Sequence, residues 1–227
     1  MHPTAASLAS TALIDSDHPL VQTFAHEHAR GATDRERAVS LYLAVRDGFR
    51  YDPYRIDLTP RGMCASGVLE KGHGWCVTKA ALLTAACRAV RIPARVGYAD
   101  VRNHLSTERL RQTMQTDLFI WHGYSDIWID GHWLKATPAF NIELCDRFGL
   151  LPLDFDGHAD SIYHPFDRAG NRHMQYVRQR GAFDDMPLQQ LLVDFVATYP
   201  GLAGMALRPV RVEDGSDFQA DAAKEAP

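Results

Sequence analysis

The chain has 227 residues, of which 46% are hydrophobic and 23% charged, and its formal net charge is -4. This length and composition are typical of a water-soluble globular chain that can bury a core. The small negative charge gives no electrostatic reason to expect nucleic-acid binding, and no apolar run approaches the roughly 20 residues that would span a bilayer. The N-terminus lacks a basic stretch followed by a continuous apolar one, so we expect no secretory signal and a cytoplasmic protein.

Four cysteines are present, at positions 64, 76, 87 and 145, and none forms a C-x-x-C pair. A zinc ribbon is therefore not indicated, and in a reducing compartment all four are expected to be free thiols. Cys87 lies within an apolar helical stripe, which predicts a core residue, whereas Cys64 and Cys145 have no surroundings that favour chemistry. The sequence contains no phosphate-binding or dinucleotide-binding glycine pattern, so we expect no cofactor.

The first part of the chain is predicted to be helical. Helices are expected at 18–30 and 34–50, the second capped by Thr33 or Asp34 and carrying an apolar stripe. An irregular stretch rich in Gly and Pro follows at 51–75. The chain then enters a second, more regular part.

A buried helix and a β-hairpin are predicted next. The run "VTKAALLTAACRAV" (77–90) has apolar residues at helical spacing, and "ARVGYADV" (94–101) is predicted to be a strand. Two alternating runs between 117 and 140 flank Asp130-Gly131, a dipeptide favoured in two-residue hairpin turns. Helices followed by an antiparallel sheet predict an α+β fold in one domain over residues 1–211.

The last third of the chain carries fewer signals. Residues 142–190 are rich in Asp, His, Gly and Pro and are predicted to be loops, whereas "LQQLLVDFVATY" (188–199) is predicted to be a helix. The acidic, alanine-rich residues 212–227 are predicted to be a disordered tail. The cluster "DFDGHADSIYHPFD" (154–167) hints at a metal but matches no Ca²⁺ or zinc signature, so we expect no metal and interpret it as a loop over the site.

Cys76 follows Gly74 and Trp75 and opens the buried helix. A helix N-terminus has partial positive charge and unpaired N–H groups. Both stabilise a thiolate and lower the thiol pKa, which is what a sulfur nucleophile requires, and the same N–H groups could hold an oxyanion. The alternative is that Cys76 is a small buried residue.

A cysteine nucleophile needs a base, which is usually histidine. Most of the eleven histidines lie in polar, loop-like stretches, and His73 is rarely aimed at a sulfur only three residues away. His122 lies inside the apolar strand "FIWHGYSDIWI", where a polar ring needs a partner. It is the candidate base, with a satisfied core histidine as the alternative. Lys79, on the first turn of the same helix, could help hold a thiolate or could be solvated.

Two stretches in this order, "GHGWCVTKAALLTAACRAVRIPARV" (72–96) and "WHGYSDIWIDGHWLKATP" (121–138), resemble the core of the transglutaminase-like cysteine enzyme superfamily. That family has Gly-x-Cys at a helix N-terminus, "GIPAR" before a strand, a strand bearing His, and a return strand that ends in Asp-Pro. The resemblance covers about residues 20–141. It implies a papain-like core in which a helix with Cys at its N-terminus packs on an antiparallel sheet.

The resemblance implies that Cys76 is the nucleophile and that His122 is the base and later the acid. The third position departs from the family, because Thr137 stands where Asp is expected. A Thr hydroxyl can accept the Nδ1–H of His122 but cannot supply negative charge to an imidazolium. Asn141 could fold back, and a carboxylate from residues 154–160 could substitute for the missing Asp.

The hairpin allows a test of this placement. A two-residue turn at Asp130-Gly131 would make Thr137 the diagonal neighbour of His122, within reach of its imidazole. Asp126 would lie roughly 13 Å from His122 along the strand, too far to touch it. It would instead face Lys135 in a cross-strand ion pair.

Two functions are compatible with these residues. The first is thiol-dependent acyl chemistry on an amide or peptide carbonyl, through a thioester that water or an amine resolves, as in cysteine proteases, amidases and transglutaminases. The second, which Thr137 favours, is a catalytically reduced or inactive domain that serves as a peptide-binding or scaffold module. Trp75, Trp121 and Tyr124 flank the pair and could line a substrate groove or simply pack. The expected partner is a peptide or small amide, and the oligomeric state is left open.

Overall fold

The computed structural model describes residues 2–103, 107–162, 167–170, 174–199 and 217–225. Its main sheet is antiparallel, with strand order β5-β4-β3-β6. These strands are β3 (Ala94–Asn103), β4 (Leu118–Ile129), β5 (His132–Ala136) and β6 (Met174–Phe183). Two short strands, β1 (Arg50–Tyr51) and β2 (His73–Gly74), pair in parallel and lead into the central helix.

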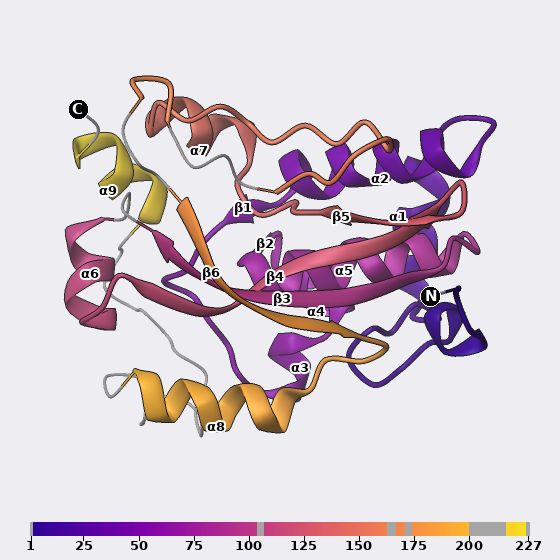
Figure 1. Ribbon diagram of the computed structural model, residues 1–227, viewed down its shortest axis with the longest axis horizontal. Helices are drawn as coiled ribbons and strands as arrows, with labels where there is room; N and C mark the ends of the chain where they lie inside the picture. Colours follow the sequence, from indigo (N-terminus) through magenta and orange to yellow (C-terminus); the bar gives the residue numbers. More distant parts are fainter. Residues whose placement is uncertain (1, 104–106, 163–166, 171–173, 200–216, 226–227) are drawn as a thin grey trace.

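Helix α5 (Cys76–Ala89) is the centre of the fold. All of its residues from Cys76 to Arg88 are buried, because it packs against β3 and β4 and also against three helices (Figure 1). Those helices are α1 (Pro19–His28), α2 (Asp34–Gly48) and α4 (Ala65–Lys71). The remaining described helices are η1 (Ala5–Leu8), α3 (Pro60–Met63), α6 (Glu108–Met114), α7 (Ile142–Arg147), α8 (Leu188–Thr198) and α9 (Phe218–Glu225). None of the helices in the described ranges has both the length and the hydropathy needed to cross a membrane.

Local signals account for the elements that were predicted. At the start of α2, Thr33 Oγ1 accepts the Glu36 N–H and the Glu36 carboxylate accepts the Thr33 N–H, which forms a capping box. In the hairpin, Ile129 pairs with His132, and the turn residues Asp130 and Gly131 have φ values of 49° and 86°, as a type I′ turn requires. The predicted α+β class and the hairpin register are therefore confirmed, as are the four free thiols.

Strand β6 lies within residues 142–190, which are predicted to be rich in loops. It pairs with β3 along Met174–Phe183 and forms one edge of the sheet. Most of its side chains are exposed or half-buried. Its sequence therefore lacks the strict alternation of apolar and polar residues by which a half-buried strand is identified.

The predicted disordered tail is also partly wrong. Helix α9 forms within it, and both Phe218 and Ala222 are buried against the rest of the molecule. The low hydropathy of the segment concealed a helix that needs only two apolar contacts on one face, three to four residues apart. Residues 212–216 and 226–227, and the predicted domain boundary near residue 211, lie outside the described residues.

Candidate active site

Cys76 is the first residue of α5, and the chain reaches it through β2. Pairing with β1 fixes the approach, because the Asp52 N–H donates to the Gly74 carbonyl at 2.9 Å. A Cβ at Gly74 would lie 2.9 Å from Thr78 Oγ1 and 3.0 Å from Lys79 Cγ. Glycine therefore allows the approach strand to fold closely onto the first helical turn, which holds Cys76 at the helix N-terminus.

His122 lies on β4 beside an irregularity in the sheet. It pairs with Ala99, and between Ala99 and Val101 the register of β3 and β4 shifts. At this shift Trp121 adopts a left-handed φ of 59°, and its N–H donates to Asp100 Oδ1 at 3.1 Å. A bulge of this kind redirects side chains relative to simple alternation, and His122 is the next residue along the strand.

Gly123 brings this strand onto the N-terminus of α5. A Cβ at this position would lie 2.9 Å from both the Cys76 carbonyl oxygen and Val77 Cα, which is too close for a real side chain. The strand that carries His122 therefore contacts the helical turn that carries Cys76. Both residues line the same pocket and are buried, with 6% of Cys76 and 5% of His122 exposed.

Replacing Gly123 with alanine is expected to push the strand away from the helix and to destabilise the fold by about 1–3 kcal/mol. The alkylation rate of Cys76 should also change in this variant, because displacement of the strand alters the surroundings of the sulfur. Thermal unfolding and mass spectrometry after iodoacetamide treatment would measure both effects. Gly48→Ala is the matched control, because a Cβ there meets nothing within 4 Å. Equal stability of the two variants would contradict the close contact.

The pocket that holds Cys76 and His122 is mostly apolar. Of the described residues that line it, fifteen carry hydrocarbon, thioether or aromatic side chains, and the other three are Cys76, His122 and Asn103. None of the described lining residues is an Asp, Glu, Lys or Arg. The space inside is about 50 Å³, which is room for a few water molecules. The chemistry is thus confined to one thiol and one imidazole in apolar surroundings.

The thiol of Cys76 is neutral in this pocket at pH 7. Burial raises the pKa of Cys76 to about 11, although the backbone N–H groups of Gly123, Val77 and Cys76 itself lower it. The helix N-terminus thus acts in the predicted direction, but the predicted net lowering of the thiol pKa is wrong. Desolvation of the charged form is the larger effect because the sulfur lies among apolar groups.

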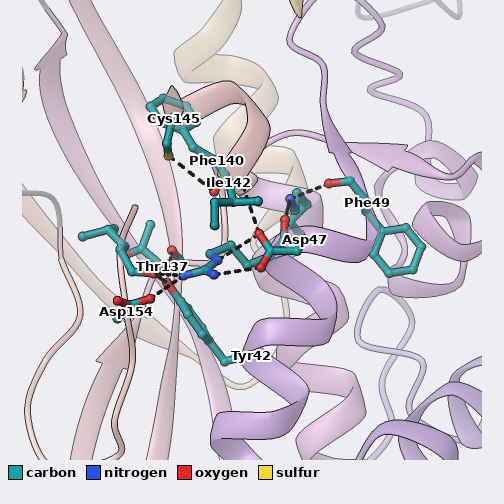
Figure 2. Close-up of polar contacts among 11 residues, drawn as sticks. Tyr42, Asp47, Phe49, Thr137, Phe140, Ile142, Cys145 and Asp154 are labelled. Atoms are coloured by element: carbon teal, nitrogen blue, oxygen red, sulfur yellow. Dashed lines mark hydrogen bonds and ion pairs between the residues drawn. The ribbon is translucent and has the colours of Figure 1, made fainter. Parts of the chain in front are cut away.

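Thr137, the candidate third residue, is buried and directly follows β5. Its N–H donates to the Ser161 carbonyl at 3.1 Å, and its own carbonyl accepts from Tyr42 Oη at 3.2 Å (Figure 2). Thr137 Oγ1 has no hydrogen-bond partner among the described residues. The bond to His122 is therefore not among the described contacts, and the role of Thr137 in a triad stays a prediction.

Two other residues of the hairpin are placed differently from the prediction. Asp126 is the register partner of Lys135, but its carboxylate is paired with Arg95 on the opposite neighbouring strand, at 2.6 Å. The guanidinium is the better donor because it matches carboxylate geometry. Lys135 Nζ lies instead 5.4 Å from the centre of the Tyr124 ring. Tyr124 packs over Gly97 and is not among the residues that line the pocket with Cys76, so its role in substrate binding stays a prediction.

The candidate substitutes for the missing Asp have other contacts. In the 154–160 stretch, Asp154 forms an ion pair with Arg46 at 2.7 Å (Figure 2). Asn141 does fold back, but its Oδ1 accepts the Tyr51 N–H at 3.1 Å and so binds the backbone of β1. In the described part of the chain, no group of three or more His, Cys, Asp and Glu residues could hold a metal ion.

The two tryptophans predicted to bind substrate have different positions. Trp75 lines the pocket. Trp121 does not: its Nε1–H donates to Asp194 Oδ2 on α8 at 2.9 Å, and the Arg180 guanidinium lies 4.5 Å from the centre of its ring. Arg180 also pairs with Asp100 and with Asp194, at 2.5 Å each. Trp121 therefore anchors α8 and β6 to the strand that carries His122 and does not line the pocket that holds Cys76.

Lys79 is fully buried, so the prediction of a solvated lysine is wrong. Its Nζ donates to the carbonyls of Arg46 and Phe49 at 2.8 and 2.7 Å. Figure 2 shows the surroundings of Phe49. These carbonyls lie at the C-terminal end of α2, where backbone acceptors lack helical partners. Burial lowers the pKa of Lys79 to about 7. Lys79 therefore ties the first turn of α5 to α2, and no described contact of its Nζ is with the Cys76 sulfur.

Sequence reasoning missed most walls of the pocket. Leu110 and Met114 come from α6, Phe195 comes from α8, and Phe218 comes from α9. Tyr199, which directly follows α8, also lines the pocket. The helix at 188–199 was predicted, and its apolar face indicated burial. The surface on which that face packs depends on the folded sheet, and the sequence has no signal for it.

A model of the family described as "Transglutaminase-like superfamily" matches residues 22–138, slightly more than half of the chain. This range includes Cys76, His122 and Thr137. The chain therefore belongs to the transglutaminase-like superfamily, and the predicted fold, with Cys76 opening a helix that packs on an antiparallel sheet, is confirmed.

Two solved structures are similar to the chain. A candidate cysteine protease from Cytophaga hutchinsonii is 18% identical with a TM-score of 0.44, and the match covers 79% of this chain and 56% of that one. A candidate protease from Parabacteroides distasonis is 19% identical with a TM-score of 0.37, and the match covers 56% of this chain and 26% of that one. The chain thus spans little more than half of the first protein and about a quarter of the second. No curated protein matches it.

Proposed function

We propose that the protein performs thiol-dependent acyl chemistry on a peptide or small amide, with Cys76 as nucleophile and His122 as base and acid. The observation that carries this proposal is that a thiol at a helix N-terminus and an imidazole line one mostly apolar pocket. A nucleophile and a base on rigid elements of the core are the arrangement that such catalysis requires. The expectations of a cytoplasmic protein without a membrane or nucleic-acid partner stay predictions.

The reaction follows from the atoms available. Cys76 Sγ attacks the carbonyl carbon, and His122 takes the thiol proton as the S–C bond forms. The C–N bond then breaks, and the same proton goes from His122 to the leaving amine, which leaves a thioester on Cys76. Water resolves the thioester to an acid, or a second amine resolves it to a new amide, and the thiol regains its proton in either case.

The surroundings of the sulfur support this sequence of steps. The N–H groups of Gly123, Val77 and Cys76 lower the pKa of the thiol, so they favour negative charge where the attack begins. The indole Nε1–H of Trp75 is buried and has no hydrogen-bond partner among the described residues. Because Trp75 lines the pocket, this N–H is a candidate donor to the carbonyl oxygen as it gains charge.

A catalytically reduced module that binds peptides is the alternative. It is favoured by Thr137 in place of Asp and by the neutral resting state of the thiol, since the pKa of Cys76 is about 11. Such a module would still use the apolar pocket. It would release its ligand unchanged, because no thioester would form.

Trapping the thioester distinguishes these two functions. We expect wild-type protein treated with the p-nitrophenyl ester of N-acetylphenylalanine to release p-nitrophenol in a burst and to gain the acyl mass on Cys76. Cys76→Ala should show neither effect, and Cys64→Ala, which changes a half-exposed thiol, should behave as wild type. Intact-protein and peptide mass spectrometry at acid pH, where thioesters survive, would measure the adduct. Binding of the ester without a burst or an adduct would favour the binding module.

A further inference from the structure

We propose that the acyl donor of this site carries a bulky apolar side chain of about the size of a phenyl ring, and that Phe218 of α9 occupies the place of this side chain. This inference rests on the proposed function of Cys76 and His122. It follows from three features of the pocket: its lack of charge, the contacts of Phe218, and the way in which α9 is held.

The pocket selects against charged and polar groups. None of its described lining residues is an Asp, Glu, Lys or Arg, so a charged side chain that entered it would lose its hydration without gaining a partner. The reactive groups are Cys76 and His122, whereas the other walls are mostly hydrocarbon and aromatic. A substrate is therefore oriented with its carbonyl at the thiol and its apolar part away from it.

Phe218 shows what these walls accept. Its ring packs edge-on against the rings of Tyr51 and Tyr54, with centroids 5.8 and 5.3 Å apart, and it lies 6.0 Å from the ring of Phe148. Edge-to-face contacts of this kind stabilise a phenyl ring beyond the burial of its area. Phe218 is 3% exposed and lines the same pocket as Cys76. Its removal would add the volume of a phenyl ring to a space of about 50 Å³.

Helix α9 is held by buried and by exposed polar contacts. The buried Gln219 donates through Nε2 to Asn141 Oδ1 at 3.3 Å, and its carbonyl accepts from Arg147 Nη1 at 3.0 Å. Exposed contacts lie at the two ends of the helix. Asp217, just before the helix, pairs with Arg50 at 2.9 Å, and both side chains are at least 40% exposed. At the other end, Glu225 lies 3.5 Å from Arg111. Exposed pairs of this kind contribute little to stability. Phe218 is the residue of α9 whose ring enters the pocket, so a substrate with an equivalent ring would compete with Phe218 for this place.

Alkylation with matched reagents tests the inference in the full chain. The probes are chloroacetamide, N-benzylchloroacetamide and N-(2-carboxyethyl)chloroacetamide, and the rates at Cys76 are divided by those at Cys64 in the same sample. The variants are Phe218→Ala, Arg50→Glu and His122→Ala. Arg50→Glu repels Asp217 and loosens α9 without removing a lining residue, so it serves if Phe218→Ala fails to fold. Phe24→Ala and Arg35→Glu are the controls, since neither Phe24 nor Arg35 lines the pocket and Arg35 forms an exposed ion pair with Asp130.

We expect N-benzylchloroacetamide to label Cys76 at least tenfold faster than the carboxylate reagent, after division by the Cys64 rates. Phe218→Ala and Arg50→Glu should each increase the benzyl rate at Cys76 severalfold, whereas the controls should not. Two results would overturn the inference about the apolar side chain: equal normalised rates for the three reagents, or no increase of the benzyl rate in either α9 variant. If His122→Ala still slows labelling of Cys76, the proposed function is not affected by such a result. If Cys76 labels in no variant, or labels without any dependence on His122, the proposed function fails as well.

Discussion

The His122→Ala variant is expected to lose at least nine-tenths of the Cys76 alkylation rate at pH 7 and to regain the wild-type rate as the pH approaches 11. Because the pKa of Cys76 is about 11, very little of the thiol ionises unaided at neutral pH, and the thiolate is the reactive form. In wild type, His122 can take the proton as the sulfur attacks. At high pH the thiolate forms without a base, so the benefit of His122 disappears.

Iodoacetamide labelling followed by mass spectrometry, at intervals between pH 6 and 10.5, would measure this difference. His132→Ala is the matched control, because His132 lies on the adjacent strand and is exposed. Thr137→Ala tests the third position of the site. If its labelling rate rises with pH more steeply than that of wild type but less steeply than that of His122→Ala, Thr137 is a positioning residue. Parallel profiles for wild type and His122→Ala would contradict the assignment of His122 as the base.

The sequence indicates Cys76 and His122 as a candidate pair because its signals are local. Cys76 is marked by the glycines before it and the apolar helix after it, and His122 by the apolar strand around it. The two-residue turn at Asp130-Gly131 then set the register of the hairpin, which is confirmed. Each of these features depends on residues within one turn or one hairpin, where spacing alone determines the geometry.

The surroundings of the pair depend on contacts between distant segments, for which the sequence gives little signal. Trp121 precedes His122 but contacts α8, because Trp121 lies in the bulge of β4 opposite Asp100 and has a left-handed φ. Phe218 lies in a polar segment that resembles a tail, and only the folded pocket shows why it is buried. The raised pKa of Cys76 arises from the same burial, so the electrostatics of the site could not be predicted from the helix N-terminus alone.

Lys79 is the clearest example of a residue whose position reverses its expected role, and its removal is expected to have a large effect on stability. Lys79→Met keeps most of the side-chain volume but leaves the carbonyls of Arg46 and Phe49 without their buried donor. An unpaired buried polar group costs about 1–3 kcal/mol, so we expect a loss of about 2–4 kcal/mol in the free energy of unfolding at pH 9, where Lys79 is neutral. Urea unfolding would measure it. Lys71→Met, at a half-buried lysine paired with Asp57, should cost at most about 1 kcal/mol.

The pH dependence of this loss identifies the protonation state of Lys79. Its pKa is about 7 in the folded protein and about 10.4 in an unfolded chain. Between these values the unfolded state binds one more proton, so wild-type stability should rise with pH by up to about 1.4 kcal/mol per unit. Lys79→Met lacks this contribution, and the difference between the two proteins should therefore widen from pH 7 to 9. Above pH 9 the buried cysteines, whose pKa values are raised in the folded state, lower the stability of both proteins as the pH rises. A difference that narrows as the pH rises would mean that the end of α2 holds Lys79 in its charged form, with a pKa above that of the unfolded chain.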